Sequence, residues 1–357
     1  GSFWITDGTR EATRALLDPV SAGLGLGPLY ATRFGDRAAL ICGLPSRMYL
    51  TDGTTRGTTL LTPEGVAPTA SWIDLGDRML FVAHDAAHGT ELWVTDGRLA
   101  GTRLLQEFVA GAAPAFNDSR MVATAGVAWV LAYVLVEGGP QRSLWRSDGT
   151  PSGTWPILAP FQVAEIRRVF AGGDRLLISR GNGELWSLGR DDRQPALVRA
   201  GVGVVREVAT GPASSWFDAG TDEFVLWYSD GSAAGTRRIA SFARSGRPEA
   251  RLIPLPDGAV LVADLNNRRV RRIGTDGIIR TIVGNGSDVE CGAPGGACGD
   301  GNLPTVAAVR TPRCVAVSPD GALYVGDSAN RRVRRVRSSM PGVSFDEFLV
   351  PSPDGEE

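Results

Sequence analysis

The amino-acid sequence predicts an all-β protein, a β-propeller made of four-stranded antiparallel blades. Two observations predict this fold. The segment ELWVTDGRLAGTRLL at 91–105 recurs in near copies along the first two thirds of the chain. The aromatic anchors of the copies are spaced 41 to 52 residues apart: Trp4, Tyr49, Trp93, Trp145, Trp186 and Trp227. A period in the forties, with aromatic residues and Asp-Gly turns, is typical of one propeller blade per repeat.

A single repeat contains four short strands. In the copy at 91–105, Leu92 to Val94 is an apolar and aromatic run that favours a buried strand. Asp96-Gly97 supplies a tight turn, and Arg103 to Leu105 begins the next strand. Two further strands precede the motif, at Met79 to Ala83 and Ser71 to Leu75. Four such strands cannot bury both faces alone, so repeats are expected to stack around a ring.

The repeats divide the chain in order. Residues 1–20 contain only the last two strands of a unit, and the unit after the third carries extra residues, a predicted surface loop, at Ala110 to Asn117. The worn copy from Glu184 has GRDDRQ in place of the Asp-Gly turn. Complete units are expected at 30–62, 70–106, 119–158, 165–200 and 204–240.

The pattern changes after residue 245, although the period persists. Residues 255–273 (LPDGAVLVADLNNRRVRRI) and 318–336 (SPDGALYVGDSANRRVRRV) both predict a strand, an Asx-rich turn and a second strand. Together with GIIRTIVGNG between them, they resemble the NHL repeat family, whose units run D-G-x-L-Y-V-A-D, N-x-R-I-R and then a TVAGNG-type strand. The resemblance covers 250–340. It implies a propeller, and the first of these units departs from it by having RLIPLPDG before its second strand.

Two other resemblances concern the rest of the chain. Residues 1–245 are similar to the ELWxxDGT repeats of large secreted bacterial proteins, and the tail SFDEFLVPSPDGEE from Ser344 is similar to the lead-in to the YD-repeat shell of RHS and teneurin-like proteins. They imply one propeller over 1–343, with 344–357 as a closing strand or a lead-in to a shell. Counting Val270 and Val333 with the six aromatic anchors predicts eight blades, or seven if the N-terminal strands pair elsewhere. Phe345 to Val350 is expected to be a spare strand that pairs with the N-terminal unit.

Composition excludes some function classes. The 357 residues are 43% hydrophobic with a net charge of −2, so no global charge favours nucleic acid or an acidic membrane. No apolar run is long enough to span a bilayer. All 37 basic residues are Arg, which suggests a GC-rich bacterial genome. No signal peptide is visible and the chain begins Gly-Ser within a motif, so we interpret it as an excised segment in which a missing export signal carries little information.

The four cysteines fall into two classes. Cys291 and Cys298 lie in the glycine-rich stretch ECGAPGGACGDGN, where a disulfide is the favoured interpretation and implies an oxidising, extracytoplasmic compartment. Zinc is the competing interpretation, although two thiols with no nearby His make a poor site. Cys42 and Cys314 lie in apolar strands, where we expect inert core thiols.

The Asp-Gly turns are the most repeated polar feature, with acids at Asp7, Asp52, Asp96, Asp148 and Asp230. Calcium binding through these carboxylates is one interpretation, but each turn offers a single acid. The favoured interpretation is a structural hairpin turn capped by Asp. The two histidines, His84 and His88, belong to one strand and its turn, which favours a hydrogen-bonded pair over a metal site.

Two arginine clusters stand out in the NHL-like segment, and they include Arg268, Arg269, Arg271, Arg331, Arg332 and Arg334. They could contact RNA or another polyanion, but single-strand readers pair basic residues with stacking aromatics, and the flanking residues are Val, Ile, Gly, Ser and Asn. A solvated face with ion pairs to Asp264 and Asp327 is the favoured interpretation.

The sequence predicts a non-catalytic interaction or scaffold domain with no cofactor. No nucleophile or phosphate-binding motif is present. The expected partner is a protein or the YD shell of the same chain, a glycan is possible, and no nucleic acid is expected. Contacts should lie on loops such as 110–118 and 286–311. One alternative is a lyase or hydrolase with its site in the central channel; another is a glycan- or polyanion-binding module. The expected location is extracellular or at the cell surface.

Overall fold

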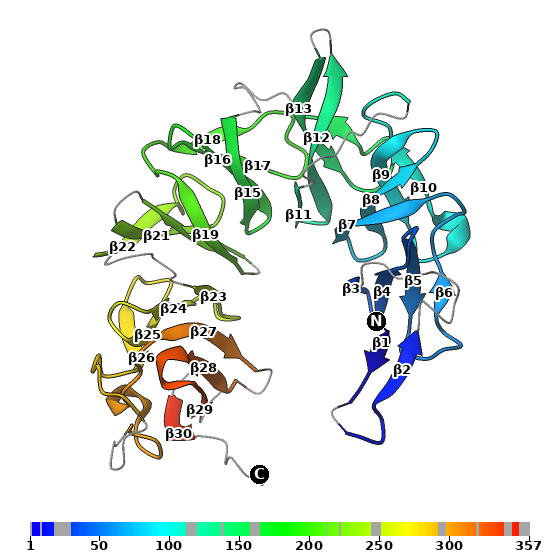
Figure 1. Cartoon of the computed structure of the whole chain (residues 1–357). Helices are drawn as coiled ribbons and strands as arrows, with labels where there is room; N and C mark the ends of the chain where they lie inside the picture. The colour runs from blue at the N-terminus through cyan, green and yellow to red at the C-terminus, as the bar shows by residue number, and fades with distance from the viewer. Residues whose placement is uncertain are drawn as a thin grey trace. The chain divides into compact units, whose positions relative to one another are not determined.

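The computed structural model describes residues 2–7, 9–17, 30–111, 120–136, 139–157, 165–211, 213–220, 223–243, 251–291, 298–318, 321–338 and 345–349. The predicted all-β class is confirmed (Figure 1). Short 3-10 helices η1 (Leu99–Gly101), η3 (Pro304–Val306) and η4 (Ser328–Asn330) interrupt the strands. In the part of the chain that the structure describes, no helix is long and apolar enough to cross a bilayer.

The described strands form eight antiparallel sheets, seven with four strands and one with two. The two-stranded sheet comes first, with β1 (Phe3–Ile5) and β2 (Arg14–Leu17). The sheets of the repeats that follow are β3 (Tyr30–Phe34), β4 (Arg37–Cys42), β5 (Arg47–Thr51) and β6 (Thr59–Leu60); β7 (Ala67–Asp74), β8 (Met79–Asp85), β9 (Gly89–Thr95) and β10 (Arg103–Gln106); β11 (Arg120–Thr124), β12 (Val127–Val136), β13 (Gly139–Ser147) and β14 (Trp155–Pro156); β15 (Ile166–Gly172), β16 (Arg175–Arg180), β17 (Leu185–Leu188) and β18 (Ala196–Arg199); β19 (Val205–Thr210), β20 (Ser215–Ala219), β21 (Glu223–Ser229) and β22 (Arg237–Ala243).

The NHL-like segment adds two sheets of the same design. They are β23 (Leu252–Pro254), β24 (Val260–Asp264), β25 (Arg269–Ile273) and β26 (Ile279–Val283); and β27 (Pro312–Val317), β28 (Leu323–Asp327), β29 (Arg332–Ser338) and β30 (Phe345–Leu349). In each sheet, strands that follow one another in the chain are neighbours. This meander needs only short turns, which explains the many Asp-Gly and Gly-rich connections. One sheet per predicted unit confirms the expected count of eight.

The central strands of the β7–β10 sheet are apolar on both faces because this sheet packs against the β3–β6 sheet on one side and the β11–β14 sheet on the other. In β8, Met79, Phe81 and Ala83 face the β3–β6 sheet, and Leu80 and Val82 face the β11–β14 sheet. All five side chains are fully buried. Alternation with a period of two places them on opposite faces of one strand. Burying a side chain as large as Phe81 contributes about 1.5–3 kcal/mol, so sheet stacking provides much of the stability.

The chain divides into two compact units, residues 1–169 with 188–196, and residues 170–187 with 197–357. Within the second unit, one apolar cluster joins the β19–β22 sheet to the β23–β26 sheet through Trp216, Leu226, Val260 and Val262. Another joins the two NHL-like sheets. The same packing principle therefore operates in both units, although their sequences differ in type.

The two ends of the chain differ in how far they agree with expectation. The N-terminal segment forms only the last two strands of a unit, as predicted. The segment at Phe345–Leu349 is not a spare strand, because β30 pairs with β29 and forms the outer strand of the last sheet. Without β30, the last NHL-like sheet would have no outer strand. The pairing of β30 with β29 satisfies the backbone N–H and C=O groups along the edge of β29.

Two further expectations concern cysteines and loops. Cys42 is fully buried in β4, as expected. Cys314 is exposed, so the prediction of a core thiol is wrong there. Strand β27 is the edge strand of its sheet and is covered on few of its residues. The predicted surface loop at 110–117 lies outside the described residues from position 112 onward.

Candidate functional site

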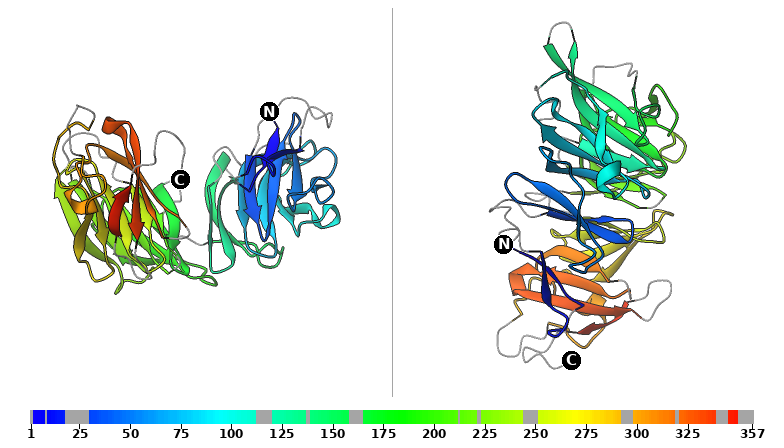
Figure 2. Two further views of the ribbon diagram at one scale, coloured as in Figure 1. Left: turned by 90° about the horizontal axis from the view of Figure 1, so that it is seen from below. Right: turned by 90° about the vertical axis from the view of Figure 1, so that its right-hand side faces the viewer.

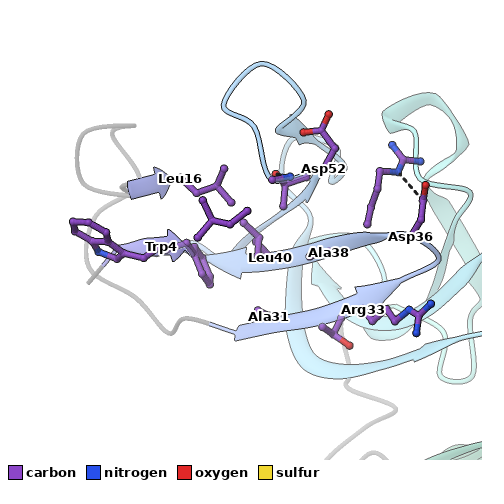
Figure 3. A pocket seen from close by; sticks show the side chains of 14 residues that line it. Trp4, Leu16, Ala31, Arg33, Asp36, Ala38, Leu40 and Asp52 are labelled. Carbon is purple, nitrogen blue, oxygen red and sulfur yellow. Dashed lines mark hydrogen bonds and ion pairs between the residues drawn. The ribbon is translucent and has the colours of Figure 1, made fainter. Parts of the chain in front are cut away.

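A pocket of about 650 Å³ lies between the two-stranded β1–β2 sheet and the β3–β6 sheet (Figure 3). The ribbons of these two sheets are neighbours in Figure 2. Its apolar lining includes Phe3, Trp4, Ile5, Leu16, Ala31 and Leu40. Figure 3 shows Leu16 and Leu40 on facing strands, with Trp4 at the open end. The Trp4 side chain is 65% exposed, whereas the equivalent Trp93 is 6% exposed. The pocket therefore exposes apolar surface, such as that of Trp4, whereas the equivalent Trp93 is buried in its own repeat.

Charged groups occupy the rim of this pocket. The Arg33 guanidinium donates to the Gly35 carbonyl at 2.7 Å, and Arg37 lies 3.9 Å from the Asp36 carboxylate. The Asp52 carboxylate is held by its own turn, described below. Each of these groups already has a local partner. The pocket therefore combines an apolar lining with charged groups at its rim.

The predicted Asp-Gly turns share one hydrogen-bonding pattern. The Asp52 Oδ1 atom accepts from the Thr54 amide and the Thr54 hydroxyl, both at 2.8 Å. The Thr54 hydroxyl in turn accepts from the Gly57 amide at 2.9 Å. The turns at Asp7, Asp148 and Asp230 repeat these Asp contacts with Thr9, Thr150 and Ser232. At Asp96 the acceptor is engaged by the Arg98 amide alone, at 3.0 Å.

These bonds favour the ionised carboxylate. The hydroxyl and amide of Thr54 lower the pKa of the Asp52 carboxyl, and the amide and hydroxyl of Thr9 lower that of Asp7. Burial alone would raise the pKa of Asp148, but the two bonds from Thr150, together with the hydrogen bond and charge of Arg146, lower the pKa. These Asp carboxylates therefore accept hydrogen bonds within their own turns. Among the described residues, no cluster of three or more His, Cys, Asp or Glu side chains is arranged to hold a metal ion.

The glycine five residues after each Asp has a steric reason. A Cβ atom at Gly57, Gly101, Gly153 or Gly235 would lie 2.0 to 2.1 Å from a carboxylate oxygen of the Asp in the same turn. Real Cβ atoms do not approach so closely, so in these four turns a larger residue would require the carboxylate or the backbone to shift. This favours the recurring Gly in D-G-x-x-x-G-T. The first turn has Ala12 at this position and keeps both bonds from Thr9 to Asp7, so its geometry accommodates a methyl group.

Each of the five turns also contains a hydrogen bond between two hydroxyl groups, which was not predicted from the sequence. A hydroxyl on the residue before the Asp bonds a hydroxyl seven residues later, in the next strand. The five pairs are Thr6–Thr13 at 2.7 Å, Thr51–Thr58 at 2.8 Å, Thr95–Thr102 at 2.7 Å, Ser147–Thr154 at 2.8 Å and Ser229–Thr236 at 2.6 Å. The sequence signal is a Ser or Thr before the Asp-Gly of each of these five turns and a Thr after the Gly or Ala that closes it.

The predicted aromatic anchors are mainly structural. Trp93 and Trp227 are 6% exposed, and each belongs to an apolar cluster between sheets. Trp145 is partly buried and packs edge-to-face on Phe108, with ring centroids 5.0 Å apart. These rings stabilise the packing of the sheets.

Both histidines bond within or next to the turn between β8 and β9. The His88 Nδ1 atom lies 2.8 Å from Asp85, and the His84 Nδ1 atom lies 3.3 Å from the Thr90 hydroxyl. The Asp85 carboxylate raises the pKa of His88 through this bond. The pair therefore belongs to a turn.

A buried carboxylate in the same repeat was also missed. Glu91, at the start of the ELW motif, is fully buried. Its two oxygens accept from the amides of Phe108 and Val109 at 2.9 and 3.1 Å. Burial raises the pKa of Glu91 to about 7, and the two amide bonds act in the opposite direction. Glu91 thus fixes the chain just after β10.

The first arginine cluster is engaged in local contacts. Arg268 lies 2.9 Å from Asp288, and Arg269 donates to the carbonyls of Asn267 and Asn285 at 3.0 and 2.8 Å. Arg271 forms an ion pair with Asp264 at 2.6 Å. Much of the positive charge of this cluster is therefore neutralised by neighbouring groups.

The second cluster contains a buried cation. Arg334 is fully buried, so the prediction that it could contact a polyanion or lie on a solvated face is wrong. Alternation along β29 turns it inward, where it lies 3.0 Å from Asp300 and 3.6 Å from Asp327. Burial lowers the pKa of Arg334, and the two carboxylates counter this effect. Arg332 lies 3.3 Å from Asp300, while Arg331 is exposed at a positive φ of 55°.

Arg334 also holds the cysteine loop. Cys291 and Cys298 are disulfide-bonded with a Cα–Cα distance of 5.4 Å, and both are buried. Arg334 donates to the carbonyls of Ala308 and Cys298 at 2.9 and 3.3 Å. The Cys291 amide donates to Asn330 Oδ1 at 3.0 Å, and Asn330 Nδ2 donates to Asp327. One buried polar network therefore joins the loop to the last sheet.

The comparisons with known proteins concern mainly the C-terminal part of the chain. Residues 249–337 match the family model described as the teneurin NHL domain. Teneurin-m of Drosophila melanogaster is 36% identical over 108 residues, and teneurin-1 of Mus musculus is 34% identical over 107. These alignments cover 29% and 28% of this chain but only 4% of each relative.

Among solved structures, an oligogalacturonate lyase in complex with manganese aligns over 91% of this chain and 92% of its own, with a TM-score of 0.44 and 12% identity. An oligogalacturonate lyase from Vibrio parahaemolyticus aligns over 100% of this chain and 98% of its own, with a TM-score of 0.43 and 9% identity. These likenesses are too distant to bear on activity. The sequence match is specific, and residues 249–337 are a teneurin-like NHL-repeat segment.

Proposed function

We propose that this chain is a non-catalytic interaction or scaffold module of a large secreted or cell-surface protein of the RHS and teneurin-like type. The observation that carries the proposal is the match of residues 249–337 to the teneurin NHL domain. The expected partner is another protein or a YD-repeat shell in the same polypeptide. Repeat-built sheets with loops at their ends are well suited to such contacts.

The site chemistry supports a non-catalytic role. The repeated acids are held by their own turns, the first arginine cluster is ion-paired, and the most buried cation stabilises a disulfide loop. A central-channel lyase or hydrolase requires converging titratable groups with a place for the reacting atom. The groups considered above are each satisfied locally instead.

An extracytoplasmic location is supported by the disulfide between Cys291 and Cys298, because such bonds persist in oxidising compartments. Mass spectrometry of protein isolated from its native source without reductant checks this directly. A peptide pair linked through the two residues is expected. Free thiols at both positions would contradict the proposed location.

The function is tested with the purified chain and the YD-repeat segment of its parent protein. Co-elution on size exclusion, and loss of the shell's protease resistance when the chain is removed, are the expected results. Turnover of oligogalacturonate that depends on a divalent metal would instead assign an enzyme. Retention on heparin that collapses with salt would assign the polyanion-binding alternative.

A further inference from the structure

The two-stranded β1–β2 sheet is a partial copy of its neighbours. Phe3, Trp4 and Ile5 of β1 occupy the positions that Met48, Tyr49 and Leu50 occupy in β5. In the complete sheet, β5 pairs with β6 on one edge and with β4 on the other. Among the described residues, β1 pairs with β2 only. One edge of β1 therefore presents backbone groups of the kind that another strand can pair with.

The next junction shows what normally lies there. In the β7–β10 sheet, Met79, Phe81 and Ala83 of β8 are fully buried against the preceding sheet. The side chains that cover them include Phe34 of β3 and Ala39 and Ile41 of β4. The inner two strands of one sheet thus cover the inner strands of the following sheet.

The corresponding face of the β3–β4 strands is less covered. Its pocket-lining residues include Ala31 and Arg33, which are exposed, and Ala38, which is half-buried. By pairing register, Ala38 and Leu40 correspond to Met79 and Phe81. The pocket of Figure 3 is continuous with the existing packing, because Ile5 lies close to Gly53 and Arg14 donates to the Gly53 carbonyl at 3.2 Å. It therefore occupies the place that two inner strands fill at the next junction.

We infer that the edge of β1 and the adjoining pocket bind a two-stranded β-hairpin from a separate segment of polypeptide. The hairpin's second strand pairs antiparallel with β1 and carries apolar residues at alternate positions, as Ala39 and Ile41 do in β4. The register of β4 and β5 gives the alignment: positions equivalent to Ile41, Leu40 and Ala39 lie opposite Phe3, Trp4 and Ile5. This inference is independent of the proposed function.

Charge at the rim restricts the hairpin's turn. At the next junction, the Gly35 amide of the β3–β4 turn donates to the Asp74 carboxylate at 3.2 Å. The position equivalent to Asp74 is Arg33 at the first junction, because each pairs opposite the equivalent residue of the second strand. Arg33 supplies a donor where Asp74 supplies an acceptor. The bound hairpin should therefore carry an acidic residue at its turn.

The test adds such a hairpin to the full chain. A copy of residues 30–46, which contains β3, β4 and the connection to β5, replaces Gly1, so that Ser2 takes the position of Arg47, with Cys42→Ser in the added copy. The expected results are a rise in Tm of about 4 °C or more, and slowing of amide exchange at 3–5 by at least about tenfold. An added copy with Leu40→Lys and Ile41→Lys is the matched control, and it should give neither effect.

Two results of this experiment would overturn the inference. No protection of 3–5, with the chain's circular dichroism unchanged, would overturn it, and so would equal gains from the lysine control. Sedimentation of the unaltered chain provides a second measurement. A concentration-dependent dimer that disappears with Phe3→Lys would show that β1 pairs with a second copy instead of a hairpin. Weaker protection with Asp36→Lys in the added copy is expected from the contact with Arg33.

Discussion

The hydroxyl groups of Thr51 and Thr58 lie 2.8 Å apart, and the same seven-residue pairing recurs at all five Asp-Gly turns. The pair joins the end of the third strand to the start of the fourth. The first hydroxyl also accepts the amide of the turn glycine, as Thr51 does from Gly53 at 3.0 Å. Each turn is therefore fixed by two layers, the hydroxyl pair and the Asp carboxylate.

Replacing a buried hydroxyl of these pairs should destabilise the fold. Thr236→Val removes bonds to the Ser229 hydroxyl and the Ser232 carbonyl, both at 2.6 Å, without a large change of shape. The expected cost is about 1–2 kcal/mol in the free energy of unfolding, measured by urea denaturation. Thr13→Val is the matched control, because its pair is exposed, and it should cost less than about 0.5 kcal/mol. Equal costs at the two sites would contradict the role of burial.

The glycine that closes the Asp230 turn should tolerate a methyl group poorly. The added Cβ of Gly235→Ala would lie 2.1 Å from the Asp230 carboxylate and displace it from Ser232. A loss of about 1–2 kcal/mol is expected in thermal or urea unfolding. In an Asp230→Ala background the same change should cost less than about 0.5 kcal/mol, since the clash is gone. An unchanged cost in that background would mean that backbone strain, not the carboxylate, selects glycine.

Arg334 should be among the least replaceable residues of the second unit. Arg334→Met leaves the buried Asp327 without its cation and frees the Cys298 and Ala308 carbonyls. Breaking a buried ion pair from one side costs about 3–5 kcal/mol. Arg331→Met, on the exposed side of the same turn, should stay within about 0.5 kcal/mol. Comparable small losses at both positions would argue against the buried network.

Glu91 should make stability fall as pH rises. Its pKa is raised to about 7 in the folded chain, above an unfolded value near 4.5, so the folded state binds the extra proton between these values. Stability is therefore highest below pH 4.5 for this group and decreases as pH rises through 7. The expected effect is about 2–3 kcal/mol, measured by urea unfolding at pH 5 to 8.

Three variants separate the effect of Glu91 from that of its neighbours. Glu91→Gln should flatten the dependence of the free energy of unfolding on pH. Glu107→Gln should leave most of that dependence unchanged. His88 acts in the same direction, because Asp85 raises its pKa, and its positive charge is lost over the same range. His88→Gln should therefore remove only the remaining part of the slope. A profile unaffected by Glu91→Gln would exclude this carboxyl as the source.

Much of the fold could be predicted because the turns are local. An Asp-Gly step with Thr or Ser two residues after Asp specifies its hairpin within eight residues, and alternating apolar residues specify the strands around it. The position of the first Asp-Gly turn, close to the start of the sequence, also predicted that the first unit has only two strands. Strand β30 was harder to place, because residues 339–344 separate it from β29 and its sequence does not repeat the motif.

The site chemistry was less predictable, because burial depends on distant residues. Arg331 and Arg334 belong to one RRVRR run, yet one is exposed and the other meets Asp300 and Asp327 from other segments. Cys314 has apolar neighbours in sequence but lies on an edge strand with few neighbours in space. Glu91 is buried because the chain after β10 supplies two amides, which its own motif does not show.

In the four turns that close with glycine, the short distance between the turn acid and a Cβ at the closing position makes these residues interdependent. The worn repeat shows the result within this one chain: Leu188, Gly189, Gln194 and Pro195 stand where other units have the first hydroxyl, the acid, the glycine and the second hydroxyl. A different contact, from the Gly189 amide to Asp192 at 2.7 Å, holds that connection. Evolution or an engineer can therefore exchange such a segment as an eight-residue cassette, whereas replacing its members singly passes through intermediates less stable than either parent.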